Sequence, residues 1–179
     1  MNATVLLPLE PPDSHLVRAA EGWVELGLPD EAEMELSQLS PEAKSHPQVL
    51  HALWGVHAHR KEWGLAHTVA ESLVEAAPDE VIGWIHRAYA ARRMDGGGLQ
   101  AAWDALRPAV EHFPAETIGP YNLACYACQM GNNDAARHWL GRAFEIAGKQ
   151  KVRESLKQLA LADADLAPLR EDILRWWAA

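Results

Sequence analysis

The side chains with the most reactive chemistry are two cysteines, Cys125 and Cys128, separated by two residues. By its spacing, a C-x-x-C pair could form a redox centre or one half of a metal site. A catalytic cysteine usually lies at a helix N-terminus or beside cations, whereas this pair is expected in the middle of a helix, and no second C-x-x-C is present for zinc. We interpret the two thiols as small side chains that fill a helix face, with a thiol or metal protein kept as an alternative.

Histidines and carboxylates are the next candidates for chemistry. The chain has nine histidines, but no two are three or four residues apart, the spacing that places two ligands on one helix face. Glu31 and Glu35 are expected on an outer helix face, and the glycines of segment 95–98 are not followed by a lysine that could hold phosphate. We therefore expect no catalytic residue, no cofactor and no metal, and a protein that is not an enzyme.

The composition restricts the partners and the location. The 179 residues carry a net charge of −9, and lysines and arginines are scattered, which argues against a nucleic-acid surface. Charged residues interrupt every long apolar stretch, so no transmembrane helix is expected. Residues 1–12 lack the basic and apolar regions of a secretory signal. The sequence thus predicts a cytoplasmic protein without a nucleic-acid or membrane partner.

The elements that would position these side chains recur along the chain. Turns followed by helix starts align at Gly27, Lys61 and Gly131, and each leads to an alanine five residues later. With Ala102 as a fourth member, the alanines Ala32, Ala66, Ala102 and Ala136 are spaced by 34, 36 and 34 residues. Each interval contains two amphipathic helical patterns. Such short helices are marginal alone in water, so they must pack on one another.

These positions resemble the tetratricopeptide repeats, whose unit is a pair of helices. The matching residues include Trp23, Gly27, Ala32, Leu50, Ala66, Pro78, Trp84, Ala88, Ala102, Pro114, Leu123, Gly131 and Ala136. The resemblance implies an all-α, right-handed α-solenoid of helix-turn-helix repeats. We predict an extended lead-in at 1–12, four repeats at 13–46, 47–80, 81–116 and 117–150, and C-terminal capping helices at 151–179. Trp54 and Arg87 depart from the family pattern, which prefers a small residue and a leucine there.

The resemblance also implies a concave groove along the first helix of each repeat. By register, the groove positions are Ser14, Val17, Glu21, Val24, Glu25, Gln48, His51, Gly55, Ala58, His59, Ile82, Ile85, Tyr89, Arg92, Arg93, Ile118, Tyr121, Cys125, Cys128 and Gln129. The first of these helices is acidic, and the middle of the groove is basic and aromatic.

This groove predicts a non-catalytic protein-protein interaction module that binds a peptide or helix of a partner protein. The binding residues we predict are His59, Tyr89, Arg92, Arg93 and Tyr121, which suit a segment with acidic and apolar residues. Arg92 and Arg93 have an alternative explanation as a solvated helix end that interacts favourably with the helix dipole.

Two other functions fit the same repeats. Trp176 and Trp177 are adjacent, and adjacent helical residues point about 100° apart, so one is expected to be exposed. This pattern favours a scaffold that forms a homo-oligomer through its C-terminal helix. A secretion-type chaperone is a further alternative, although four full repeats argue against the three-repeat type.

Overall fold

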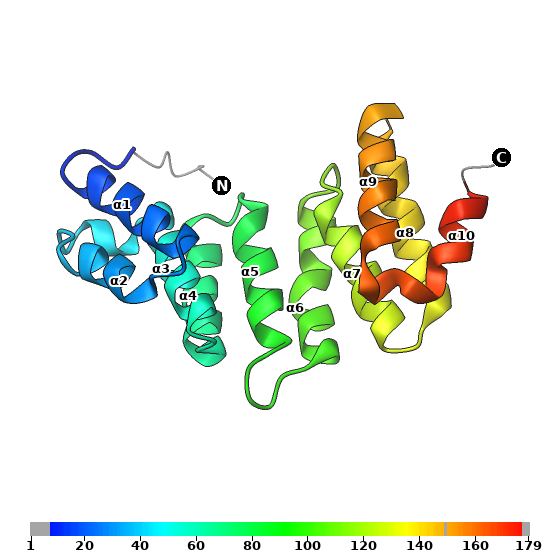
Figure 1. The fold of residues 1–179 in the computed structure, drawn as a ribbon, viewed down its shortest axis with the longest axis horizontal. Helices are drawn as coiled ribbons and strands as arrows, with labels where there is room; N and C mark the ends of the chain where they lie inside the picture. The colour runs from blue at the N-terminus through cyan, green and yellow to red at the C-terminus, as the bar shows by residue number, and fades with distance from the viewer. Residues whose placement is uncertain (1–7, 149, 177–179) are drawn as a thin grey trace. The chain divides into compact units, whose positions relative to one another are not determined.

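The computed structural model describes residues 8–148 and 150–176, and in these ranges the chain is helical without any strand. The prediction of an all-α fold is confirmed (Figure 1). The α-helices are α1 (Asp13–Glu25), α2 (Pro29–Ser37), α3 (Pro47–His59), α4 (Trp63–Ala76), α5 (Val81–Ala91), α6 (Leu99–His112), α7 (Ile118–Gln129), α8 (Asn133–Ala147), α9 (Gln150–Ala162) and α10 (Arg170–Arg175), with 3-10 helices η1 (Ala43–Ser45) and η2 (Ala164–Leu169).

The chain divides into two compact units, unit 1 (1–90) and unit 2 (91–179). In unit 1, α1 packs on α2 and α3 packs on α4, and in unit 2, α6 and α8 both pack on α7. The boundary lies at the end of α5, inside the predicted repeat 81–116. The division of the chain into four repeats remains a prediction.

The helices of each unit pack on one another with small residues fully buried between them. In unit 1, Ala20 of α1 and Ala32 of α2 are fully buried, and in unit 2 the same holds for Ala124 of α7 and Ala136 of α8. A methyl group lets two helix backbones approach, and larger apolar side chains then fill the space around the contact. The 3.6-residue periodicity of the sequence therefore produces a continuous apolar side on each helix.

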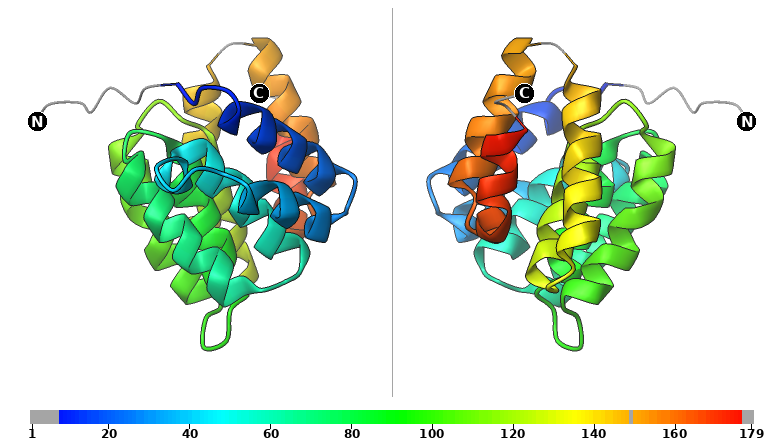
Figure 2. Two further views of the ribbon diagram at one scale, coloured as in Figure 1. Left: turned by 90° about the vertical axis from the view of Figure 1, so that its left-hand side faces the viewer. Right: turned by 90° about the vertical axis from the view of Figure 1, so that its right-hand side faces the viewer.

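The C-terminal segment completes the core of unit 2. After α9 the chain continues as η2, which packs on α7, and then as α10, which packs on α9 and η2 (Figure 2). Leu166 and Leu169 of η2 and Ile173 of α10 are all fully buried. No helix in the described ranges is both long enough and apolar enough to cross a membrane.

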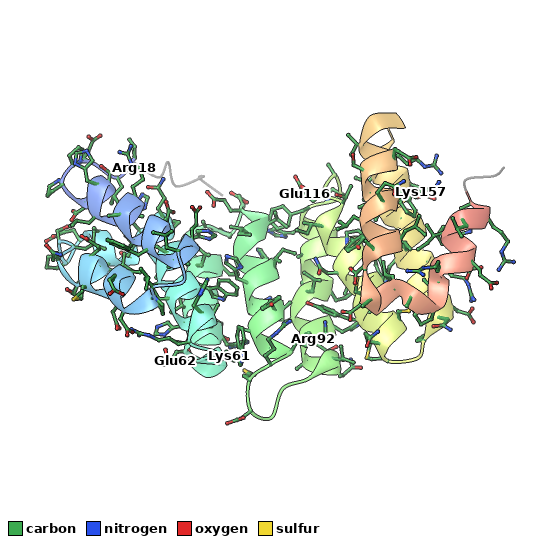
Figure 3. All side chains as sticks on the ribbon, in the orientation of Figure 1. Arg18, Lys61, Glu62, Arg92, Glu116 and Lys157 are labelled. Atoms are coloured by element: carbon green, nitrogen blue, oxygen red, sulfur yellow. The ribbon has the colours of Figure 1, made fainter. Side chains whose placement is uncertain are left out.

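Three of the turns between consecutive helices, those after α1, α3 and α7, share one hydrogen-bond pattern. After α1, the N–H of Gly27 donates to the carbonyl of Val24, and the next N–H donates to Trp23. The turns after α3 and α7 repeat these two bonds at Lys61 and Gly131. This arrangement ends a helix with a residue of positive φ, usually glycine. Lys61, labelled in Figure 3, adopts φ 59° at the position where the other two turns have glycine.

Replacing Lys61 with glycine is expected to stabilise the protein. A left-handed conformation costs an L-residue about 1–2 kcal/mol, and the greater freedom of glycine in the unfolded chain offsets part of that gain. We expect Lys61→Gly to raise the free energy of unfolding in urea by about 0.5–1 kcal/mol. Gly27→Ala is the opposite change in the equivalent turn, and it should lower the free energy of unfolding. Equal midpoints for Lys61→Gly and the parent would contradict this account.

Candidate functional site

A cavity of about 740 Å³ lies on unit 1, and we call it the unit-1 cavity. Its lining residues are Glu21, Val24, Glu25, His51, Ala52, Trp54, Gly55, Ala58, His59, Trp63, His86 and Tyr89. All except Ala52, Trp54, Trp63 and His86 are groove positions assigned by the repeat register. The volume falls within the range of about 300–1,000 Å³ that is typical of ligand sites.

Helical spacing explains why these side chains meet. Residues three or four apart share a helix face, so α1 presents Glu21 with Glu25, and α5 presents His86 with Tyr89. Helix α3 supplies half of the lining, and Trp63 is the first residue of α4. The lining residues of α3 are His51, Ala52, Trp54, Gly55, Ala58 and His59. Gly55 of α3 allows Val24 of α1 to pack closely against it, because a Cβ at that position would lie 3.2 Å from the side chain of Val24.

The buried His86 and the partly buried His51 and Trp54 contact one another in the cavity wall. The rings of Trp54 and His86 are stacked, with centroids 3.7 Å apart and planes 7° from parallel. His86 Nε2 and His51 Nδ1 are 3.0 Å apart and share a hydrogen bond whose donor depends on the tautomer. Burial, with a smaller contribution from His51, lowers the pKa of His86 to about 3. His86 is therefore uncharged at neutral pH.

The aromatic wall of the cavity continues from Trp54 to Tyr89 and Trp63. The ring of Tyr89 is 6.0 Å from Trp54 in an edge contact and 5.8 Å from Trp63. Trp54 Nε1 is buried and has no hydrogen-bond acceptor among the described residues. An unsatisfied buried donor costs about 1–3 kcal/mol, and such costs are concentrated at functional sites.

A second cavity, of about 400 Å³, adjoins the first and shares Glu21 and His51 with it. Its other lining residues are Pro8, His46, Pro47, Gln48, Leu73, Glu80 and Ile82. The two cavities together carry three carboxylates, Glu21, Glu25 and Glu80, and no lysine or arginine lines either of them.

In unit 2, the groove positions Arg92, Tyr121 and Gln129 contact the chain's own C-terminal segment. Arg92, labelled in Figure 3, places Nη1 2.8 Å from Oδ2 of Asp165, and this pairing raises the pKa of Arg92. The hydroxyl of Tyr121 donates to Asp163 at 2.9 Å, and Gln129 donates to the backbone carbonyl of Asp165. Tyr121 is only 7% exposed, and its burial raises its pKa. An external partner would have to displace these contacts to reach Arg92 or Tyr121.

Cys125 and Cys128 are both buried within unit 2. Burial is the main cause of a raised pKa at each thiol, and the carboxylates of Asp163 and Asp165 raise both further. Because the thiolate is the reactive form, this environment opposes thiol chemistry. Over the described residues, no group of three or more His, Cys, Asp or Glu side chains is placed to hold a metal ion.

Of the two C-terminal tryptophans, Trp176 lies within the described residues. Trp176 is partly buried against the core of unit 2, and its ring makes an edge contact with Phe144 at 6.2 Å. Trp177 lies outside the described residues. The prediction that one of them is an exposed self-association contact is not tested by this geometry.

The predicted binding residues separate into two sets. His59 and Tyr89 line the unit-1 cavity, whereas Arg92, Arg93 and Tyr121 belong to unit 2. The predicted set did not include Trp54, Trp63, His51 or His86, which also line the cavity. The sequence did single out Trp54, because a tryptophan stands where the repeat pattern prefers a small residue. The other departure, Arg87, places its guanidinium 4.7 Å from the ring centroid of Trp84.

The fold is identified by comparison with solved structures and not by comparison of sequences. No protein-family model matches the sequence, and no curated protein sequence matches it.

Solved structures do match the chain over most of its length. A thermophilic TPR protein of Thermus thermophilus is 18% identical, with a TM-score of 0.64 over 93% of this chain and 97% of that one. A Podosopora anserina protein described as a kinesin light chain with nearly identical TPR-like repeats is 18% identical, with a TM-score of 0.67 over 94% of this chain and 95% of that one. MamA is 17% identical, with a TM-score of 0.62 over 96% and 93% of the two chains. These structures, at 17–18% identity, show that the chain has the all-α solenoid fold of tetratricopeptide-repeat proteins.

Proposed function

We propose that this protein is a non-catalytic protein-protein interaction module that binds a peptide or helix of a partner in the unit-1 cavity. One observation carries the proposal: eight of the residues that the repeat register assigns to a groove on α1, α3 and α5 line one cavity of about 740 Å³. A cavity built on rigid helices presents a preformed surface, which lowers the entropic cost of binding a segment.

The lining chemistry supports recognition of a protein segment. Aromatic rings supply large apolar contact area, and the histidines and carboxylates around them supply hydrogen-bonding groups. Aromatic residues are enriched in protein interfaces for this reason. The adjoining second cavity extends the same surface, so that a segment longer than one side chain has room to lie across it.

The same chemistry argues against catalysis in the unit-1 cavity. A general base works best when its pKa is near the working pH, whereas His86 has a pKa of about 3. His86 Nε2 and His51 Nδ1 also share a hydrogen bond, so these two ring nitrogens already have a partner. We therefore assign the histidine pair a structural role in shaping the cavity.

Removing cavity side chains is expected to weaken partner binding. We would select random displayed peptides on the full chain, then measure their affinity for the parent and for His59→Ala/Tyr89→Ala by fluorescence polarisation. Loss of an aromatic and a polar contact is expected to weaken binding about tenfold or more, equivalent to about 1.4 kcal/mol or more.

The matched control is Leu65→Ala, because Leu65 is 54% exposed on α4 and does not line the cavity. Circular dichroism would verify that all variants remain folded. Peptides that bind the parent and the double variant equally would show that the cavity is not the binding site.

For unit 2, a partner segment with acidic and apolar residues remains a prediction. It would compete with Asp163 and Asp165 for Arg92 and Tyr121. This requirement makes the unit-1 cavity the better supported site.

Self-association through the C-terminal helices is the second candidate. Leu159 of α9 and Leu174 of α10 are 54% and 52% exposed, which gives this segment apolar surface beyond Trp176. Exposed apolar residues near a chain end favour contact with another copy. A molar mass by light scattering that stays monomeric at every concentration would eliminate this candidate.

A further inference from the structure

The charged residues of the two unit 1 cavities all have the same sign. Glu21, Glu25 and Glu80 line them without a lysine or arginine. Glu21 belongs to both cavities, and Glu25 lies one helical turn away on the same face of α1. These carboxylates therefore give the surface a negative electrostatic potential, which acts on any segment that binds there.

Within the part of the chain that the structure describes, no other side chain pairs with these carboxylates. Glu21 and Glu25 have no ion pair or hydrogen bond to another described side chain, whereas Asp30 and Glu33 of the same unit are both bound by Arg60. Two acidic groups one turn apart repel each other, which slightly destabilises α1. A cation from outside the chain would relieve this repulsion.

Aromatic rings stand beside the carboxylates in the same cavity. Trp54, Tyr89 and Trp63 form a continuous wall in which Tyr89 contacts both tryptophans. The face of an aromatic ring attracts ammonium and guanidinium groups, most strongly for tryptophan. The aliphatic stem of a lysine or arginine also gains from apolar contact with such rings. His86 adds no opposing charge, because its low pKa keeps it neutral.

We infer that the segment bound by unit 1 is basic, and that a lysine or arginine side chain of the partner protein enters the unit-1 cavity between Glu21, Glu25 and the aromatic wall of Trp54, Trp63 and Tyr89. This inference rests on the proposed function and adds the charge of the partner. It differs from the acidic and apolar partner expected from Arg92 and Arg93, because Arg92 is already paired with Asp165.

The experiment uses the peptides selected on the full chain. We expect lysine and arginine to be enriched in them over the starting library. Replacing the enriched lysine with norleucine, which keeps the stem and removes the charge, is expected to weaken binding about tenfold. Glu21→Gln/Glu25→Gln is expected to weaken binding of the parent peptide by a similar factor, and added salt should reduce the affinity.

The matched control for total charge is Glu42→Gln/Glu75→Gln. Both residues are exposed in unit 1 and neither lines either of these two cavities, so this variant loses the same charge elsewhere. It should bind the basic peptides as the parent does. Equal weakening in the two double variants would show that the attraction is only to the net charge of the chain, and would overturn the inference.

The remaining outcomes separate this inference from the proposed function. Peptides that lose binding to His59→Ala/Tyr89→Ala, but lack lysine and arginine or bind Glu21→Gln/Glu25→Gln normally, would overturn the basic partner and leave the binding site standing. Peptides that are indifferent to His59→Ala/Tyr89→Ala would overturn the site and the inference together. A selection that yields no binding peptide would also overturn both the binding site and the inference of a basic partner.

Discussion

Acidification from pH 7 to pH 5 is expected to lower the free energy of unfolding by about 2 kcal/mol through His86 alone. The folded-state pKa of His86 is lowered to about 3 by burial and by His51, whereas an unfolded histidine has a value of about 6.5. Between these values the unfolded chain binds a proton that the folded chain does not. The stabilisation is therefore fully present above about pH 6.5 and is lost as the pH falls towards 3.

Urea unfolding at several pH values, followed by tryptophan fluorescence, measures this effect. His86→Gln has no titratable group at this position, so its stability should fall less steeply with pH than that of the parent. His15→Gln is the control, because His15 is exposed on α1 and should leave the slope unchanged. A parallel pH dependence in the parent and His86→Gln would refute the burial of a neutral histidine.

Leu166→Ala is expected to have the largest effect on stability, lowering the free energy of unfolding by about 2–5 kcal/mol. Leu166 is fully buried in η2 and packs in the core of unit 2 with residues of α7 and α8. Removing its side chain leaves a cavity and loosens the segment that carries Asp163 and Asp165. Calorimetry or urea unfolding would measure the loss.

Thiol reactivity provides a second measurement on the same variant. Cys125 and Cys128 are buried, and Cys125 lies 3.6 Å from Asp163, so a reagent reaches them only when this region opens. Leu166→Ala should therefore increase the rate of thiol modification under native conditions. Leu174→Ala is the matched control, since Leu174 is 52% exposed in α10. Equal stabilities for Leu166→Ala and Leu174→Ala would show that η2 is not part of the core.

The repeated elements were predictable because their causes are local. Gly27, Lys61 and Gly131 align in the sequence, and the structure forms the same pair of turn hydrogen bonds at each. Ala32 and Ala136 are buried at the positions where the repeat spacing aligned them. A turn or a helix face depends on residues a few positions apart, and that information is present in the spacing itself.

The inner face of unit 1 was also predictable, but its chemistry was not. Register alone placed Glu21, His51 and Tyr89 along one surface, and they line one cavity. The contact of His51 with His86, 35 residues away, depends on how the rings of α3 and α5 are turned towards each other. Trp54 was visible only as a departure from the repeat pattern, and its stacking on His86 results from the same packing.

In unit 2 the sequence identified the inner positions but not what covers them. Arg92 and Tyr121 were expected to meet a partner, and in the structure they bind Asp165 and Asp163, which are 73 and 42 residues further along the chain. Periodicity reports which side of a helix faces inward, because that property repeats every few residues. It contains no information on which distant segment packs there, since that depends on the shape and charge of surfaces formed only when the helices come together.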